Sequence, residues 1–417
     1  MNKVDDFSPL TTKVERTVLE NGIRVVTERM PYMRSASVGV WVKTGSGQET
    51  QKNNGIAHFV EHMLFKGSKK RTAKEIAGSL ESLGGLINGS TGKELCIYNA
   101  HVLDENTSIA IDVLADLVQY PQFDAKDVEH EKQVILSEIV HSKEDPQELA
   151  FDYFFQHAFP DHPLGYFILG NEENVKTFHR DDLFEFHQRY YTPDRLVCAA
   201  AGNVNHTEFV ELVGQHFSQH YPAQEISSHL PGSPKSQVTL QLPQLHQSHI
   251  CFGYKIFGQR DERRTVLALL DVLLGGGMSS RLFQNIREKY GFAYNVFSFA
   301  DTMADTGVFG AYMACHPTKV KKSLQLLENE FDSLRNGNID ETELADATSQ
   351  VKGNLILGLE NSSRRMRKIG ESESYGRAHQ TIQNIVDKVE KIGVDDVVRL
   401  ANDLFTDENK SITVITP

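Results

Sequence analysis

The stretch SASVGVW at residues 35–41 is short, rich in valine and followed by a Gly-Ser turn, which predicts a buried β-strand. An apolar helical pattern follows it at residues 55–67 (GIAHFVEHMLFKG). The same order returns later in the chain, with a strand-like stretch at 248–254 (SHICFGY) and an apolar helical stretch at 265–277 (TVLALLDVLLGGG). We interpret this repeat as a duplication, with chance similarity of two α+β segments as the alternative.

The remaining patterns extend the repeat into two domains. Helical periodicity at 106–119 and a strand pattern at 196–201 complete a first α+β unit. Residues 219–236 contain three prolines and no apolar periodicity, which is typical of a linker. We therefore predict an α+β fold with two similar domains, 1–218 and 237–417, each a mostly antiparallel sheet with helices on one face.

Composition excludes several classes of function and partner. The 417 residues include 43 Lys and Arg against 56 Asp and Glu, a net charge of -13, which argues against nucleic acid and favours basic peptides as partners. No segment has the roughly 18–20 apolar residues of a membrane span, and no signal peptide is visible, so we expect a cytoplasmic protein that does not bind membranes. The four cysteines are too scattered for a CxxC zinc or redox site: Cys96, Cys198, Cys251 and Cys315.

The motif HFVEH at residues 58–62 places three polar residues on an otherwise apolar helix. His58 and His62 stand one helical turn apart on the same face, with Glu61 beside them. Two imidazoles can then bind one metal ion while the carboxylate reaches a bound water, as in the inverted zinc motif H-x-x-E-H. The alternative is a pair of hydrogen-bonded core histidines.

A zinc hydrolase needs a third protein ligand. The helical pattern at 126–142 offers Glu131 and Glu138, seven residues apart at the edge of an apolar stripe. Carboxylates in such a place are costly unless they meet a cation. Taken alone, both could equally be solvated or salt-bridged.

These motifs resemble the pitrilysin/insulinase family of inverted-motif zinc peptidases, most closely its short-chain branch, which includes the β subunit of mitochondrial processing peptidase and bacterial homologues. The resemblance covers nearly the whole chain. It is carried, beyond the zinc helix and ILSEI around Glu138, by GGLINGSTGKELCIY at 84–98, HPLGYFILG at 162–170, YYTPDRLVCAAAGNV at 190–204 and SSRLFQNIREKYGFAYNVFSF at 279–299.

The resemblance implies a role for each matched residue of the first half. His58, His62 and Glu138 would bind one Zn²⁺ per chain. Glu61 would be the general base that activates water, and Glu131 would orient the zinc helix or the water.

The resemblance also implies substrate contacts. Asn88 and Gly89 would lie on a strand whose edge binds an extended peptide; the family commonly has Ala at the second position, so the geometry there is less certain. Arg287 and Tyr294 match the family's Arg and Tyr of the second half. Tyr294 would stabilise the oxyanion, and Arg287 would hold the substrate backbone or that tyrosine.

The predicted function is therefore a zinc metalloendopeptidase acting on extended or unfolded peptides and presequences. A non-catalytic structural or peptide-binding subunit of the same family is the alternative. Heterodimeric members of the family divide the metal motif and the Arg/Tyr pair between two chains, whereas this chain carries both. The resemblance therefore implies a homodimer whose active site is shared between chains, while a monomer or a heterodimer remains open.

Overall fold

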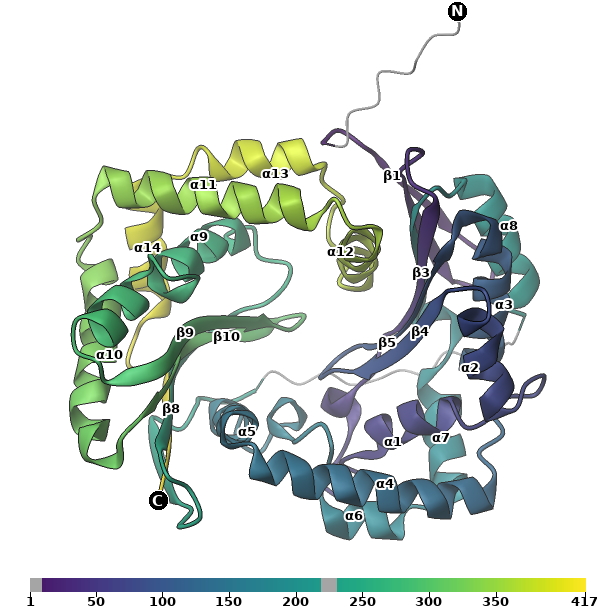
Figure 1. Cartoon of the computed structure of the whole chain (residues 1–417), viewed down its shortest axis with the longest axis horizontal. Helices are drawn as coiled ribbons and strands as arrows, with labels where there is room; N and C mark the ends of the chain where they lie inside the picture. The colour runs from purple at the N-terminus through teal and green to yellow at the C-terminus, as the bar shows by residue number, and fades with distance from the viewer. Residues whose placement is uncertain (1–9, 219–230) are drawn as a thin grey trace, which may run out of the picture. The chain divides into compact units, whose positions relative to one another are not determined.

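A computed structural model of the chain describes residues 10–218 and 231–417 (Figure 1). Of the expected linker 219–236, residues 219–230 lie outside the described residues, and the rest has no regular helix or strand. The chain forms two compact units. The first consists of the described parts of Met1–Val140, Phe167–Ser228 and Ile356–Gln383; the second consists of the described parts of His141–Tyr166, His229–Leu355 and Asn384–Pro417.

The first unit contains a six-stranded sheet in which every pair is antiparallel except the parallel pair β2–β6. Its strands, in sheet order, are β1 (Val14–Val18), β2 (Arg24–Arg29), β6 (Leu196–Gly202), β3 (Ser35–Val42), β5 (Cys96–Leu103) and β4 (Leu86–Thr91). The strand expected from SASVGVW is therefore β3, at the centre of the sheet. The edge strand β4 follows the left-handed Gly84, whose φ is 73°.

The second unit contains a five-stranded sheet with the same plan. Its strands, in sheet order, are β7 (Gln237–Gln241), β11 (Lys410–Thr416), β8 (Ser248–Phe257), β10 (Thr306–Cys315) and β9 (Ala293–Thr302). The pair β7–β11 is parallel and the others are antiparallel, as in the run β2–β6–β3–β5–β4. The shared order and directions confirm the predicted pair of similar α+β domains.

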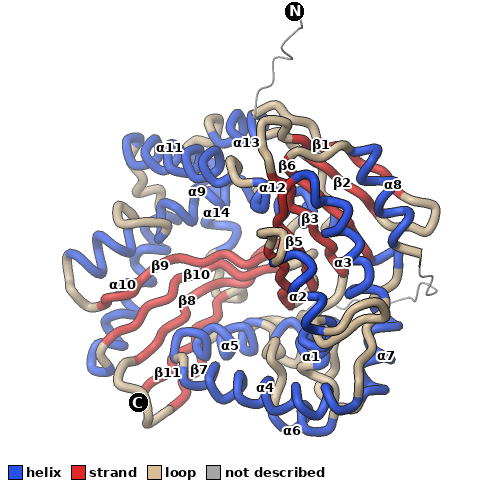
Figure 2. Tube along the Cα trace, turned by 45° about the vertical axis from the view of Figure 1, so that its right-hand side comes forward, coloured by secondary structure: helices blue, strands red, loops and turns tan. Residues whose placement is uncertain are grey.

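Helices cover the sheets, which are drawn in red in Figure 2. In the first unit, alternate residues of β3 (Ala36, Val38, Val40 and Val42) are fully buried in one apolar core with residues of α1, α3, α4, α7 and α8. In the second unit, the matching core lies between the sheet and residues of α9, α10, α11 and α14. No helix within the described residues is both long and apolar enough to cross a bilayer.

The helices have the following bounds: α1 Ile56–Leu64, α2 Ala73–Glu81, α3 Thr107–Gln119, α4 Ala125–Glu144, α5 Pro146–Ala158, α6 Glu172–Thr177, α7 Arg180–Tyr190, α8 His206–His216, α9 Arg264–Gly275, α10 Val320–Arg335, α11 Glu341–Gly358, α12 Ser362–Ser374, α13 Ile382–Val389 and α14 Val394–Leu404.

Each sheet also carries one helix on its other face, which the expectation of helices on one face did not include. In the first unit this is α12, whose Met366 and Ile369 pack against the fully buried Trp41 of β3. Arg365 of the same helix forms a buried ion pair with Glu28 of β2. In the second unit α5 takes this place, packed on β8, β10 and β11. Residues on both sides of the expected boundary therefore contribute to each unit.

The contact between α12 and β3 predicts that one added methyl group lowers the stability of the fold considerably. A Cβ at Gly370 would lie 2.5 Å from the Trp41 ring, and both residues are buried. We expect Gly370→Ala to lower the free energy of unfolding by about 1–3 kcal/mol. Denaturant titration followed by tryptophan fluorescence measures this locally, because Trp41 is the only tryptophan of the chain.

Gly214→Ala is the matched control, since Gly214 is exposed in α8 and no described atom outside its own helix would lie within 4 Å of the new methyl group. This variant should be neutral or up to about 1 kcal/mol more stable because alanine favours helix. Equal effects of the two substitutions would contradict the packing described here.

Candidate metal centre

Helix α1 is held at its first turn by a buried carboxylate. The helix follows Gly55, whose φ of 101° suits a residue without Cβ. Glu49 Oε1 accepts a hydrogen bond from the Ala57 amide at 2.8 Å, and its Oε2 accepts from the Gly55 amide at 2.9 Å and from Asn54 Nδ2 at 2.7 Å. Burial raises the pKa of Glu49 to about 7. These contacts fix the backbone one residue before the first histidine of the motif.

Three potential ligand atoms converge between α1 and α4. His58 Nε2 and His62 Nε2 lie 3.2 Å apart, and Glu138 Oε2 lies 3.4 Å from His62 Nε2 and 3.9 Å from His58 Nε2. Tetrahedral bonds of roughly 2.05 Å to zinc require ligand atoms about 3.3 Å apart. Within residues 10–218 and 231–417, these three residues are the one group of this kind.

The chemistry of the donors fits a cation. Burial lowers the pKa of His58 to about 3, so its imidazole is neutral at pH 7 and offers a lone pair. Glu138 Oε2 is buried and accepts no hydrogen bond from any described residue, although its side chain as a whole is 43% exposed. A buried carboxylate oxygen without a donor is costly unless a cation lies beside it. The three residues could therefore hold a divalent metal ion.

Glu131 lies behind the second histidine. Its Oε1 accepts a hydrogen bond from His62 Nδ1 at 2.8 Å, and its Oε2 lies 2.6 Å from Lys66 Nζ. Because the proton of His62 is then on Nδ1, Nε2 keeps its lone pair toward His58 and Glu138. His58 has no such support, since its buried Nδ1 lacks a hydrogen-bond partner among the described residues.

Glu61 projects from α1 toward the edge strand β4. Its Oε2 accepts a hydrogen bond from Thr91 Oγ1 at 2.9 Å. Burial raises the pKa of the Glu61 carboxyl, against the opposing effects of Thr91 and His62. A Cβ at Gly89 would lie 2.9 Å from Glu61 Oε1 and 2.8 Å from the Phe65 ring, so the strand backbone passes very close to this carboxylate.

The predicted substrate residues lie on β4, at the edge of the sheet. Among the described strands, β4 pairs with β5 only, so its other side is an open edge. Asn88 is exposed and Gly89 is half-buried. An open edge next to Glu61 is the geometry that main-chain pairing with an extended peptide needs.

The structure brings Arg287 and Tyr294 together in the second unit. Arg287 lies in the π-helical turn Phe283–Glu288, and its guanidinium carbon is 4.5 Å from the centre of the Phe283 ring and 4.9 Å from that of Tyr294. Tyr294, at the start of β9, is 83% exposed. The arginine therefore stacks between two rings and holds an exposed tyrosine in place.

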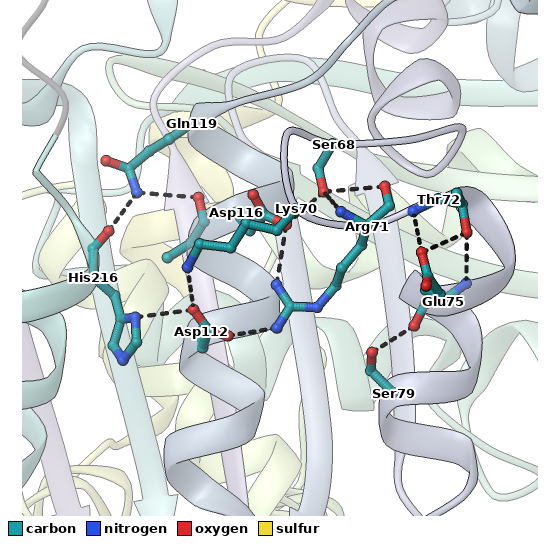
Figure 3. Close-up of polar contacts among 11 residues, drawn as sticks. Ser68, Lys70, Arg71, Thr72, Glu75, Ser79, Asp112, Asp116, Gln119 and His216 are labelled. Atoms are coloured by element: carbon teal, nitrogen blue, oxygen red, sulfur yellow. Dashed lines mark hydrogen bonds and ion pairs between the residues drawn. The ribbon is translucent and has the colours of Figure 1, made fainter.

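The loop after α1 is tied to α3 by an ion-pair network (Figure 3). Arg71 binds Asp112 and, at 3.0 Å, Asp116. Ser68 donates to Asp116 at 2.5 Å, and His216 of α8 lies 3.0 Å from Asp112. Figure 3 shows the Arg71 guanidinium pointing at the α3 carboxylates, so the segment that follows α1 is anchored to α3.

Comparison with known proteins decides the family. The insulinase family model (peptidase family M16) matches residues 24–172, and the model described as the peptidase M16 inactive domain matches residues 177–351. An uncharacterized zinc protease of Mycobacterium leprae is 40% identical over 97% of this chain and 92% of its own length. The chain belongs to the insulinase family, peptidase family M16. This confirms the resemblance that its motifs predicted.

A second relative has a similar length, and a solved structure has the same fold. The uncharacterized zinc protease YmxG of Bacillus subtilis is 35% identical over 97% of this chain and 98% of its own length. The crystal structure of a protease from Helicobacter pylori covers 97% of this chain and 100% of its own with a TM-score of 0.92 at 24% identity, which shows a shared fold. The description "inactive domain" fits the second half, where α9 carries Ala268, Asp271 and Val272 in the register of the zinc motif.

Sequence reasoning missed four residues that support the M16 motif: Glu49, Lys66, Thr91 and Phe283. Glu49 had one local signal, an acidic residue shortly before a helix that lacks a Ser, Thr, Asp or Asn at its N-cap. Thr91 lay within the recognised segment 84–98 but thirty positions from its partner, and no periodicity links the two.

The capping role of Glu49 predicts that replacing it destabilises the fold more than replacing Glu75, which caps another helix. Glu49→Ala would leave three buried N–H groups without an acceptor, and we expect the free energy of unfolding to fall by about 2–4 kcal/mol. Glu75→Ala is the control, because Glu75 caps α2 at the exposed surface and should cost about 0.5–1 kcal/mol. Denaturant titration with Trp41 fluorescence compares them; similar small losses would rule out the role assigned to Glu49.

Proposed function

We propose that this M16 protein is a zinc metalloendopeptidase that cleaves extended or unfolded peptides, including presequences. The observation that carries the proposal is the convergence of His58 Nε2, His62 Nε2 and the donor-free Glu138 Oε2 beside the carboxylate of Glu61. Zinc is proposed as the metal, one ion per chain, because two imidazoles and one carboxylate form a typical three-ligand hydrolytic site and relatives are named zinc proteases.

Zinc bound there would supply Lewis acidity, which polarises a substrate carbonyl and lowers the pKa of a bound water. Glu61 then takes the proton from the attacking water at a carboxylate oxygen, as a general base. Glu131, through His62 Nδ1, keeps the imidazole in the tautomer and orientation that metal binding requires.

The substrate is proposed to be held as an added strand. The open edge of β4 offers main-chain groups to an extended peptide, with the Asn88 amide beside them. Because Gly89 on this strand nearly touches Glu61, a peptide paired to β4 would bring a backbone carbonyl close to the base. Main-chain pairing of this kind explains why unfolded peptides rather than folded domains are the expected substrates.

The second unit is proposed to contribute Tyr294 and Arg287. The exposed Tyr294 hydroxyl can donate to the oxyanion that forms when water attacks the carbonyl, and Arg287 keeps its ring in position or binds the substrate backbone. We further propose that two copies of the chain form a homodimer in which this pair acts on the metal site of the partner.

The assignment of Glu61 as the base predicts that one substitution can abolish catalysis and leave metal binding intact. Glu61→Gln should keep zinc and lose about 10²–10⁴-fold in turnover, because an amide of the same shape cannot accept the proton. His62→Ala and Glu138→Ala should instead lose the metal itself. Elemental analysis together with cleavage of a fluorogenic peptide measures both properties. A fully active Glu61→Gln enzyme would refute the assignment, and wild-type protein without stoichiometric zinc would favour the non-catalytic alternative.

The shared site predicts recovery of activity by mixing two inactive variants. Glu61→Gln and Tyr294→Phe damage different halves of the proposed site, so one of the two sites in a mixed dimer is intact. We expect co-assembled hybrids, isolated by two affinity tags, to regain up to about half of the wild-type activity per dimer, as two-fold symmetry requires. If verified hybrids stay inactive, action in trans is wrong, while the zinc assignment is unaffected.

A further inference from the structure

The carboxylate of Glu61 is fixed by the edge strand as well as by its own helix. Thr91, the last residue of β4, donates its hydroxyl proton to Glu61 Oε2 at 2.9 Å. Gly89, two residues earlier on the same face of the strand, leaves room for the other oxygen, since a Cβ added at Gly89 would lie 2.9 Å from Oε1. One oxygen of the proposed base is therefore hydrogen-bonded to β4, and the other lies next to the glycine of that strand.

A buried chain of polar groups orients the Thr91 hydroxyl. Cys96, paired with Thr91 across the β4–β5 ladder, donates its thiol proton to Thr91 Oγ1 at 3.8 Å. Burial raises the pKa of Cys96 to about 12, so the group is a thiol and keeps this proton. The nearby Tyr191 hydroxyl influences the pKa of this thiol, and it lies 2.7 Å from the Tyr98 hydroxyl.

This arrangement leaves one favourable orientation for the hydrogen of the Thr91 hydroxyl. Its oxygen is already an acceptor for the thiol, so its own hydrogen points to Glu61. Cys96 and Tyr98 are fully buried and Tyr191 is 4% exposed, so water does not reach the inner end of this chain. The chain reaches from the general base into the core of the first unit.

The second unit contains the same contact without the metal residues. Asp271 of α9, in the register of Glu61, accepts a hydrogen bond from Ser298 of the edge strand β9 at 2.5 Å. Ser298 also donates to the Asp271 backbone carbonyl, so the contact there joins helix and strand. In this fold, an edge-strand hydroxyl can therefore serve only to join the strand to the helix. A test of Thr91 must separate that structural role from an effect on catalysis.

We propose that Thr91 is a positioning residue for the general base, holding the Glu61 carboxylate in the orientation that accepts the proton from water. The inference rests on the proposed function, because it assigns Thr91 an effect on turnover through Glu61. It requires that the hydroxyl, and not the shape of the side chain, carries the effect.

Thr91→Val removes the hydroxyl and preserves the shape, whereas Thr91→Ser keeps the hydroxyl. We expect Thr91→Val to lower kcat about 10–100-fold, the usual loss for a group that orients a catalytic residue. KM should change less than about twofold, because Thr91→Val leaves the main-chain groups of the β4 edge unchanged. Zinc content should be unchanged, because the Thr91 hydroxyl bonds Glu61 and not one of the proposed ligands. A tenfold loss of kcat corresponds to about 1.4 kcal/mol. Thr91→Ser should recover most of the activity.

Two controls separate positioning from folding. Ser298→Ala removes the corresponding hydroxyl of the second unit and should lower the unfolding midpoint without changing kcat. In a Glu61→Gln background, Thr91→Val should cause no further loss of the residual activity, because the two act as one unit. Thr91→Ala is the second variant if valine prevents folding, as judged by Trp41 fluorescence.

The inference is overturned if Thr91→Val keeps wild-type kcat, if Thr91→Ser fails to restore activity, if the loss follows loss of zinc, or if it adds fully to that of Glu61→Gln. The proposed function fails by a different result, namely full activity of Glu61→Gln alone. A dead Glu61→Gln enzyme with a fully active Thr91→Val enzyme would therefore reject only the role of Thr91.

Discussion

The structure of the first unit depends on one constraint, which is that an apolar, largely buried helix carries two imidazoles and a carboxylate that must all be satisfied. His62 is hydrogen-bonded to Glu131, whose other oxygen is paired with Lys66, and Glu61 is hydrogen-bonded to Thr91. The remaining lone pairs, on His58 Nε2, His62 Nε2 and Glu138 Oε2, face one another, and a shared cation would stabilise that arrangement.

The second unit shows that the same fold forms around a helix without the polar motif. Both units place an apolar helix against a sheet of the same strand order, and both join a carboxylate of that helix to a hydroxyl of the edge strand. In the second unit Ala268 and Val272 stand in place of the histidines, so that helix has no imidazole pair. The second unit instead carries Arg287 on a π-helical turn, a distortion often found at functional positions, and this arginine stacks on Tyr294 at the start of β9.

Much of the fold could be predicted because local patterns determine it. The strand at 35–42, the helix at 107–119 and the repeat of strand and helix follow from apolar periodicity. The placement of α12 on the first unit could not be predicted, since SSRRMRKIGESES resembles a solvent-exposed helix. Its burial depends on contacts distant in sequence, the ion pair of Arg365 with Glu28 and the fit of Gly370 against Trp41. The convergence of His58, His62 and Glu138 agrees with the predicted ligand set, whereas the support from Glu49 and Thr91 required coordinates.

The central claim is that these three side chains form a zinc site, and the coordination shell of the metal in the purified protein tests it most directly. X-ray absorption at the zinc edge measures that shell without any substrate. The account predicts two imidazole nitrogens and oxygen ligands at roughly 2.0–2.2 Å and no sulfur. Sulfur scattering near about 2.3 Å would indicate cysteine ligands. That result, or a shell without imidazole, would contradict a site built from His58, His62 and Glu138.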